Sequence, residues 1–175
     1  MAQAHHFQER HDTMNAMPQV TVPNFGELLA PYIGSVPAEA VPAFLARLER
    51  TAADRYRLWA DAVPEHAEGL LRCAAREDDI ADRAEQIYPA TAPEQVAAME
   101  AAIGPAKETY YEVFSTLTPI EQMAVQAKAE RQGAAAWRAM IETESDPAIQ
   151  SALEEMATIE EASADYLDAL LPGLT

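Results

Sequence analysis

The sequence predicts an all-α protein whose core is an antiparallel four-helix bundle. Hydrophobic residues make up 49% of the 175-residue chain, and alanine supplies much of that share, while glycine occurs only 6 times. This composition favours packed helices over sheets. Prolines also divide the chain into four long stretches in which apolar residues recur at helical spacing. A chain of this length buries a core in one domain without disulfides.

The N-terminal segment, residues 1–38, differs from the rest of the chain because it is rich in proline and holds only short apolar pieces. We interpret it as a tail followed by an extended N-terminal arm, which packs over the bundle or reaches a neighbouring subunit. The apolar residues between Val20 and Ile33 are too few for a core of their own. We therefore expect a homodimer or a higher homo-oligomer as the partner arrangement.

Four helix-forming stretches follow the arm, and two of them have clear start signals. Thr118 is a predicted N-cap, with Pro119 in the first helical position and Glu121 completing a capping box. Asp146 followed by Pro147 marks the other start. The four expected helices cover approximately residues 38–63, 65–88, 118–144 and 146–171.

The connections between these helices define the expected topology. Only a few residues join the first helix to the second and the third to the fourth, so each pair should form an antiparallel hairpin. A long crossover, residues 90–118, joins the two hairpins and should be helical in part, at 93–103 and 106–117. The bundle with its crossover then spans residues 39–175. One long crossover is not the simple up-down-up-down connectivity.

The inward stripe of each expected helix is apolar or small, except for Ser163 and one glutamate near its middle. At 1.5 Å per helical residue, the glutamates of each hairpin lie at similar distances from the turn that joins its helices. If the hairpins pack in register, four carboxylates meet in the centre of the bundle. The candidate metal ligands are Glu49, Glu77, Glu130 and Glu160.

Four ionised carboxylates in a core repel one another and lose hydration, so their charge must be compensated. They bind cations, share protons, pair with basic residues or turn out to face water. A divalent metal is the usual solution, and an oxygen-rich glutamate site suits iron or manganese. The basic residues near enough in sequence to neutralise them instead are Arg76, Arg83, Lys128 and Arg131.

Two of these glutamates begin similar patterns. The chain reads Glu-x-x-Ala-x-x-x-Tyr from Glu49 to Tyr56, and Glu-x-x-Gly-x-x-x-Trp from Glu130 to Trp137. At these residues it resembles the ferritin-like superfamily, especially rubrerythrin-type carboxylate di-iron proteins, and the near-repeat resembles the internal duplication of that superfamily. The resemblance covers approximately residues 40–170. It implies a ferritin-like bundle, iron or manganese as cofactor, and an oxidoreductase of the di-metal type.

The chain departs from the family pattern at two ligands. The family has a glutamate on the first and third helices and Glu-x-x-His on the second and fourth. Here Ile80 and Ser163 stand where the two histidines would be. The remaining histidines lie in the tail or near a helix start, at His5, His6, His11 and His66.

Three functional interpretations follow from these residues. The first is a metal-binding ferritin-like protein, an oxidase or a metal-handling protein, that uses the four glutamates. The second is a metal-free ferritin-like bundle that acts as a binding or assembly module through its arm and crossover. The third is a bundle that encloses an organic ligand, with Tyr56, Trp59 and Trp137 lining the cavity.

Composition excludes several other classes. The net charge of −17 disfavours nucleic acid and anionic lipid as partners. No apolar run is long enough to cross a membrane, and the polar N-terminus does not read as a signal peptide, so we expect a cytoplasmic protein. Cys73 is the single cysteine, which excludes an internal disulfide. Its apolar neighbours indicate a small core residue rather than a nucleophile.

Overall fold

The computed structural model describes residues 20–174, and all the regular secondary structure of this part of the chain is helical, as predicted. It contains six α-helices, three short 3-10 helices and no β-strand. The tail residues His5, His6 and His11 lie outside the described residues. The α-helices are α1 Phe25–Ile33, α2 Val41–Ala62, α3 Ala67–Ile87, α4 Pro93–Glu112, α5 Pro119–Ile141 and α6 Pro147–Leu170.

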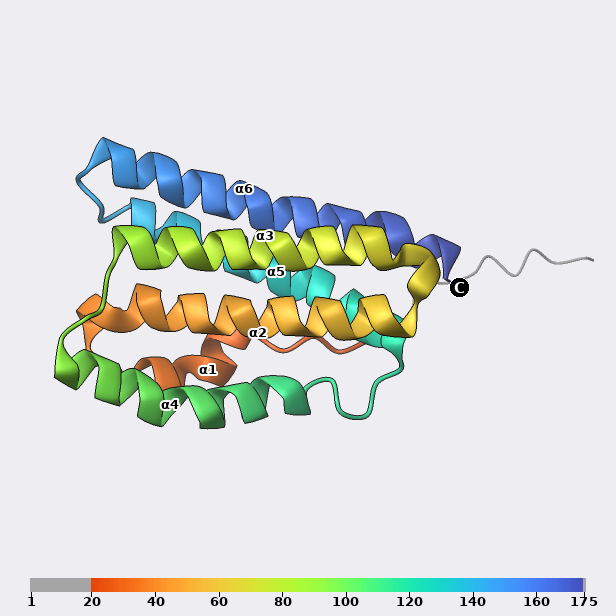
Figure 1. The fold of residues 1–175 in the computed structure, drawn as a ribbon, viewed down its shortest axis with the longest axis horizontal. Helices are drawn as coiled ribbons and strands as arrows, with labels where there is room; N and C mark the ends of the chain where they lie inside the picture. Colours follow the sequence, from red (N-terminus) through yellow and green to blue (C-terminus); the bar gives the residue numbers. More distant parts are fainter. Residues whose placement is uncertain (1–19, 175) are drawn as a thin grey trace, which may run out of the picture.

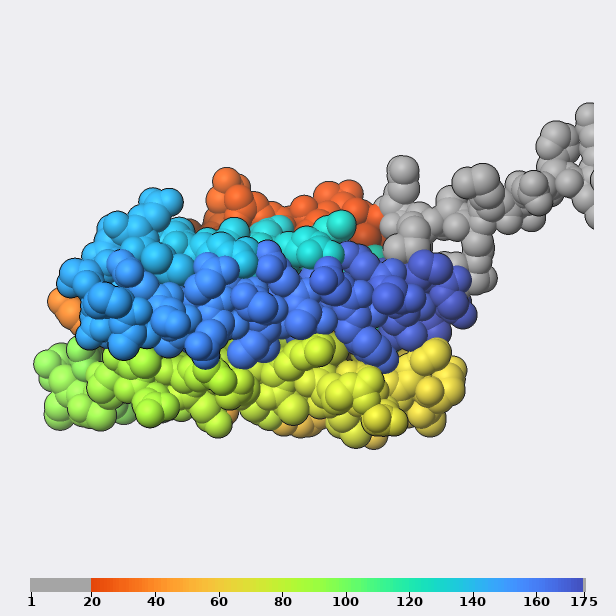
Figure 2. Space-filling view, turned by 90° about the horizontal axis from the view of Figure 1, so that it is seen from above, coloured from red at the N-terminus to blue at the C-terminus, as the bar shows by residue number. Residues whose placement is uncertain are grey.

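The four longest helices form two antiparallel hairpins (Figure 1). One hairpin joins α2 to α3 through the 3-10 turn Pro64–His66, and the other joins α5 to α6 through residues 142–146. The two hairpins meet where α3 packs against α6, and these helices lie side by side along the molecule in Figure 2. α2 and α5 are more widely separated, and α1 packs against α5 on this side of the molecule.

The predicted caps start α5 and α6. The Thr118 hydroxyl accepts a hydrogen bond from the Glu121 amide, and the Glu121 carboxylate accepts one from the Thr118 amide at 2.9 Å. At the start of α6, the Asp146 carboxylate accepts a hydrogen bond from the Ala148 amide at 2.8 Å. These caps satisfy amides that have no partner within the helix, and they fix where the second hairpin begins and turns.

The crossover between the hairpins is α4, which packs against α1 and α2. α4 and the loop that follows it run along the molecule, because α3 ends and α5 begins at opposite ends (Figure 1). The sequence predicted two helical pieces here, whereas α4 is continuous through Gly104 and Pro105. Both residues are exposed, so water solvates the carbonyl that loses its helical partner. Gly104 also has no β-carbon to clash with the proline ring.

The segment that the sequence predicted as an extended arm contains a helix, α1. The Asn24 side chain caps it by accepting a hydrogen bond from the Glu27 amide at 3.1 Å. Phe25 and Leu29 are buried, and α1 packs on α4 and α5 of the same chain. Because these apolar side chains are covered within one chain, exposure of the arm no longer supports a homodimer.

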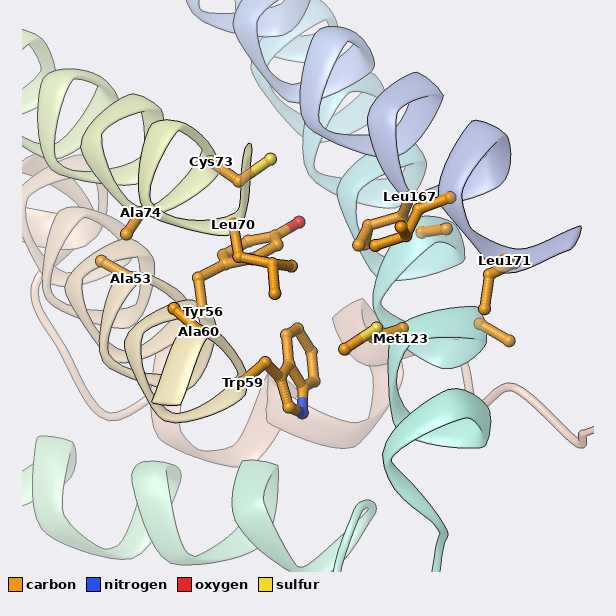
Figure 3. Packing of buried hydrophobic residues seen from close by; sticks show 13 residues of the cluster. Ala53, Tyr56, Trp59, Ala60, Leu70, Cys73, Ala74, Met123, Leu167 and Leu171 are labelled. Carbon is orange, nitrogen blue, oxygen red and sulfur yellow. The ribbon is translucent and has the colours of Figure 1, made fainter. Parts of the chain in front are cut away.

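Two apolar clusters fill the interior between the hairpins. The first lies toward the turn between α2 and α3, and its buried members include Tyr56, Trp59, Leu70, Met123 and Leu167. Figure 3 shows these side chains extending toward one another from four helices. The second cluster lies toward the turn between α5 and α6, and its buried members include Ile80, Trp137, Leu153 and Met156.

A polar layer separates these clusters. On α3, Cys73 belongs to the first cluster and Ile80 to the second, and Glu77 stands between them. The same order recurs on the other three long helices, so each contributes one acidic residue to the layer. These residues are Glu49, Glu130 and Glu160.

Within the described residues, none of the helices has both the length and the apolar character needed to cross a membrane.

Candidate metal centre

The structure brings three of the four predicted glutamates into direct proximity. One carboxylate oxygen from each of Glu49, Glu77 and Glu160 lies within 4.8 Å of the others. Glu77 and Glu160 are fully enclosed, whereas Glu49 is partly exposed. The three residues come from α2, α3 and α6, so the group depends on the packing of both hairpins.

Glu130 lies beside this group of three rather than within it. Its Oε1 accepts two hydrogen bonds of 2.8 Å, one from the Tyr56 hydroxyl and one from the Gln126 side-chain amide. Burial is the largest cause that raises the pKa values of Glu49 and Glu77, and the charge of Glu130 is the next. For Glu160, burial and the charge of Glu49 come first, and a hydrogen bond and the charge of Glu130 raise its pKa further. The fourth glutamate therefore belongs electrostatically to the same polar layer.

Two further donors orient the enclosed carboxylates. The Ser163 hydroxyl donates to Glu77 Oε1 at 2.8 Å, and the Trp137 indole donates to Glu160 Oε1 at 3.1 Å. The second oxygen of Glu77 is buried and has no hydrogen-bond partner among residues 20–174. An unpaired buried carboxylate oxygen is costly in a core, and binding a cation would remove that cost.

The electrostatic state of the layer follows from this crowding. Burial, followed by the charge of Glu130, raises the pKa of Glu49 to about 8. Burial is also the largest cause that raises the pKa values of Glu77 and Glu160 well above their usual range, and the neighbouring glutamates add to it. Without a cation, these carboxyls therefore retain protons near neutral pH.

Pairing with basic residues does not neutralise the layer. Arg83 and Arg131 form their ion pairs with acidic residues at the surface. Arg76 donates a hydrogen bond to the Ala162 carbonyl at 3.1 Å, and Lys128 is exposed. Burial and the neighbouring glutamates raise the pKa of Glu77, and the charge of Arg76 opposes them only as a smaller effect. Among residues 20–174, no ion pair includes any of the four glutamates. Of the ways to compensate the carboxylate charge that the sequence left open, cation binding and proton sharing remain.

The sequence-based prediction missed Gln126, and it named Gly133 in the Glu-x-x-Gly pattern without its structural role. Gln126 lies one helical turn before Glu130, so the spacing of four residues on one helix was a usable signal. Gly133 leaves the space that the Glu160 carboxylate occupies, because a β-carbon at position 133 would lie 2.5 Å from Glu160 Oε1. That role depends on contact between two helices and has no local signal.

A cavity of about 810 Å³ reaches the polar layer from the side of α1, α2 and α5. Glu49, Glu130 and Glu160 form part of its wall, and Glu77 does not. The sequence offered Tyr56, Trp59 and Trp137 as residues lining a cavity. Trp137 does line this one, but Tyr56 and Trp59 do not, because they pack in the first apolar cluster.

The donor set fits a hard divalent cation. Carboxylate oxygens are ligands that manganese and iron accept, and two divalent ions would balance four ionised carboxylates. The two positions where the resemblance would place histidines have other roles. Ile80 packs in the second apolar cluster, and Ser163 holds Glu77. His66, at the start of α3, lies three helical turns from Glu77 along the sequence, so it does not take the place of either missing histidine.

Because the candidate ligands are oxygens alone, this set is harder than one that contains imidazole. Each of Glu77, Glu130 and Glu160 has one oxygen fixed by a neighbouring donor. Such supporting hydrogen bonds orient metal ligands in known sites.

Comparisons of the chain with models of protein families, with curated protein sequences and with solved structures give no match.

Proposed function

We propose that this chain is a ferritin-like protein that binds iron or manganese through Glu49, Glu77, Glu130 and Glu160. The observation that carries the proposal is the group of three carboxylates from three helices, whose oxygens lie within 4.8 Å of one another. No basic side chain of the described residues pairs with them, and Glu77 keeps a buried oxygen without a partner. A divalent cation would compensate the charge of the carboxylates and give the unpaired Glu77 oxygen a partner.

The arrangement of the helices supports the ferritin-like part of the proposal. Two antiparallel hairpins are joined by one long helical crossover, and each long helix contributes one glutamate to the same layer. That topology is characteristic of carboxylate-bridged metal proteins built on helical bundles. In this proposal Glu49, Glu77 and Glu160 hold the metal most directly. Tyr56 and Gln126 orient Glu130, whose carboxylate completes the charge.

The chemistry of such a site is that of its metal. A bound iron or manganese ion supplies a Lewis acid and a centre that changes oxidation state. The chain supplies the charge that retains the ion, the donors that fix the carboxylates, and an apolar surround. The resemblance implies an oxidoreductase, and the ligand set of oxygens alone also suits a metal-handling role.

Metal binding is tested with Glu77→Gln. Wild-type protein treated with chelator should bind Mn²⁺, or Fe²⁺ without oxygen, retain it through desalting, and melt at a higher temperature. Metal at a hundredfold excess over its Kd stabilises the fold by about 2.7 kcal/mol. The variant should lose both retention and the shift. Its new amide can donate to neighbouring carboxylates, so the metal-free variant should melt above metal-free wild type.

Glu161→Gln is the matched control. Glu161 adjoins Glu160 on α6, but its carboxylate pairs with Arg138 at the surface. This variant should bind metal as wild type does and change stability by less than about 1 kcal/mol. If metal neither stays with wild-type protein nor shifts its melting temperature, the proposed metal function is wrong.

A metal-free ferritin-like bundle, acting as a binding or assembly module, is the second candidate. The observation that favours it is the replacement of both expected imidazole ligands by Ile80 and Ser163. The raised pKa values of the carboxyls also allow them to share protons instead of binding a cation. Under this function, Glu77→Gln should still raise the melting temperature, and metal should have no effect on either protein.

A further inference from the structure

The cavity beside the polar layer has apolar walls along most of its length. α1 contributes Phe25 and Leu29, α2 contributes Leu45 and Leu48, and α5 contributes Ala129 and Ala136. The small residues on α5 leave the space that the larger side chains of α1 and α2 face. At about 810 Å³, the cavity lies within the usual range for small-molecule sites, about 300–1,000 Å³.

The inner end of this cavity is acidic. Glu49, Glu130 and Glu160 are part of its wall, and none of them forms an ion pair with a described residue. Glu49 also has no hydrogen-bond partner among residues 20–174, although it is the most accessible of the three. The enclosed Glu77 lies behind them, outside the cavity wall. A ligand in the cavity therefore meets Glu49 before it meets the deepest carboxylate.

The neutral polar side chains of the wall are already engaged. Gln126 accepts from the Tyr110 hydroxyl at 2.6 Å and donates to Glu130. Gln132 accepts from the Phe25 amide at 2.8 Å and donates to the Pro23 carbonyl at 3.0 Å, which fastens the start of α1 to α5.

The Asn24 side-chain oxygen caps α1. At the inner end of the cavity, the Glu49 carboxyl is therefore the group that has no partner among the described residues. A positive charge beside a carboxyl favours its ionised form, whose oxygens accept hydrogen bonds. A complementary ligand must bring a donor, and a positively charged donor also compensates the acidic end.

We propose that this cavity binds a primary aliphatic amine, with its alkyl chain between α1, α2 and α5 and its ammonium group against Glu49. The ammonium group donates three hydrogen bonds and carries one positive charge, whereas an alcohol lacks the charge and a carboxylate is repelled. The inference goes beyond the proposed metal function and does not rest on it. One divalent ion balances only half of four ionised carboxylates, so the amine also has a counter-charge beside a single bound metal.

The test compares three probes of equal chain length, decylamine, decanol and decanoate, by calorimetry on chelator-treated protein at neutral pH and below micelle-forming concentrations. Decylamine should bind at least about tenfold more tightly than either other probe, which corresponds to about 1.4 kcal/mol. Glu49→Gln should remove this preference and leave decanol binding unchanged. Equal affinity for the three probes, or no binding of decylamine, would overturn the proposal.

The position of the alkyl chain is tested with Ala136→Phe, which fills the cavity from an exposed position on α5. This variant should abolish decylamine binding. Ala139→Phe is its control, because Ala139 is exposed on the same helix and lies outside the cavity wall. Undiminished decylamine binding by Ala136→Phe would place the amine elsewhere and overturn the site. If Ala136→Phe does not fold, the three-probe comparison with Glu49→Gln still decides the proposal.

A parallel titration with Mn²⁺ separates this inference from the metal function. Decylamine binding without Mn²⁺ binding would contradict the metal function alone. Mn²⁺ binding without decylamine binding would contradict the amine site alone.

Discussion

Gly133 on α5 lies directly against the carboxylate of Glu160 on α6. A β-carbon at position 133 would lie 2.5 Å from Glu160 Oε1 and 2.9 Å from its carboxyl carbon, closer than real side chains approach. The same oxygen accepts the hydrogen bond of the Trp137 indole at 3.1 Å. The missing side chain at position 133 therefore allows Glu160 to reach the polar layer while Trp137 holds it.

Gly133→Ala should consequently destabilise the protein, although alanine is the better helix former. Overpacking a core costs about 1–3 kcal/mol, and helix propensity returns about 1 kcal/mol. We expect the free energy of unfolding to fall by up to about 2 kcal/mol in urea denaturation followed by tryptophan fluorescence. Metal retention should weaken as well, because the new methyl group displaces the Glu160 carboxylate.

Gly104→Ala provides the control for this substitution. Gly104 is also inside a helix, but apart from its chain neighbours and the helix's own backbone nothing lies within 4 Å of a β-carbon placed there. The following Pro105 disfavours a β-carbon at this position and offsets the gain in helix propensity, so the free energy of unfolding should change by less than about 1 kcal/mol. A loss at position 104 as large as the loss at 133 would show that contact with Glu160 is not the cause.

Tyr56→Phe should loosen Glu130 without opening a cavity. The change removes the hydroxyl that donates to Glu130 Oε1 at 2.8 Å and leaves the ring in the first apolar cluster. We expect a loss of about 1–2 kcal/mol of stability in thermal or urea unfolding. Metal affinity should fall by about 10–100-fold if Tyr56 supports a ligand, as outer hydrogen bonds do in metal sites.

Tyr88→Phe is the matched control, because the Tyr88 hydroxyl donates to another glutamate, Glu144, at 3.0 Å and outside the polar layer. It should reduce stability modestly and leave metal affinity unchanged. Equal effects of the two substitutions on metal affinity would show that Tyr56 has no particular role at the proposed centre.

Most of the fold could be predicted because its signals are local. Helix starts at Thr118 and Asp146 depend on a cap and a proline next to each other in the sequence. The meeting of the glutamates follows from the constant rise of a helix, which places residues at equal distances from a short turn opposite one another. This explains why Glu49 and Glu77 meet, whereas Glu160 joins them because the two hairpins pack in register.

The features that the sequence did not predict depend on contacts between distant segments. A proline such as Pro105 normally interrupts a helix, and its exposed position on α4, together with the preceding Gly104, explains why the helix continues. α1 is short for an independent helix, and it is stabilised by packing on α4 and α5. The cavity is formed by three helices at once, so no single amphipathic pattern indicates it.

Cys73 should resist thiol reagents in the folded protein. It is fully buried in the first apolar cluster, and burial raises the pKa of its thiol to about 12. The reactive thiolate is therefore scarce and inaccessible at neutral pH. Labelling with an aromatic disulfide reagent should be slow in buffer and rapid in concentrated urea. Rapid labelling under native conditions would contradict this burial, and the single cysteine makes the readout unambiguous.

The stability of the metal-free protein should fall as pH rises from about 5 to about 8. Burial raises the pKa of Glu49 from 4.5 to about 8, and the pKa values of Glu77 and Glu160 shift in the same direction. Between these limits the folded chain binds more protons than the unfolded chain, so raising the pH favours unfolding. Melting temperatures measured with chelator at pH 5, 6, 7 and 8 should therefore decrease.

Added Mn²⁺ should reverse this dependence, because the metal binds deprotonated carboxylates and its stabilisation grows as protons leave. The difference in melting temperature between metal-loaded and chelator-treated protein should be smallest at pH 5 and largest near pH 8. In the presence of chelator, Glu49→Gln should reduce the fall in melting temperature with rising pH. Glu161→Gln should not, because Arg138 lowers the pKa of Glu161 and places its titration below this window. A melting temperature that rises with pH in the presence of chelator would contradict the crowding of carboxylates that underlies the site.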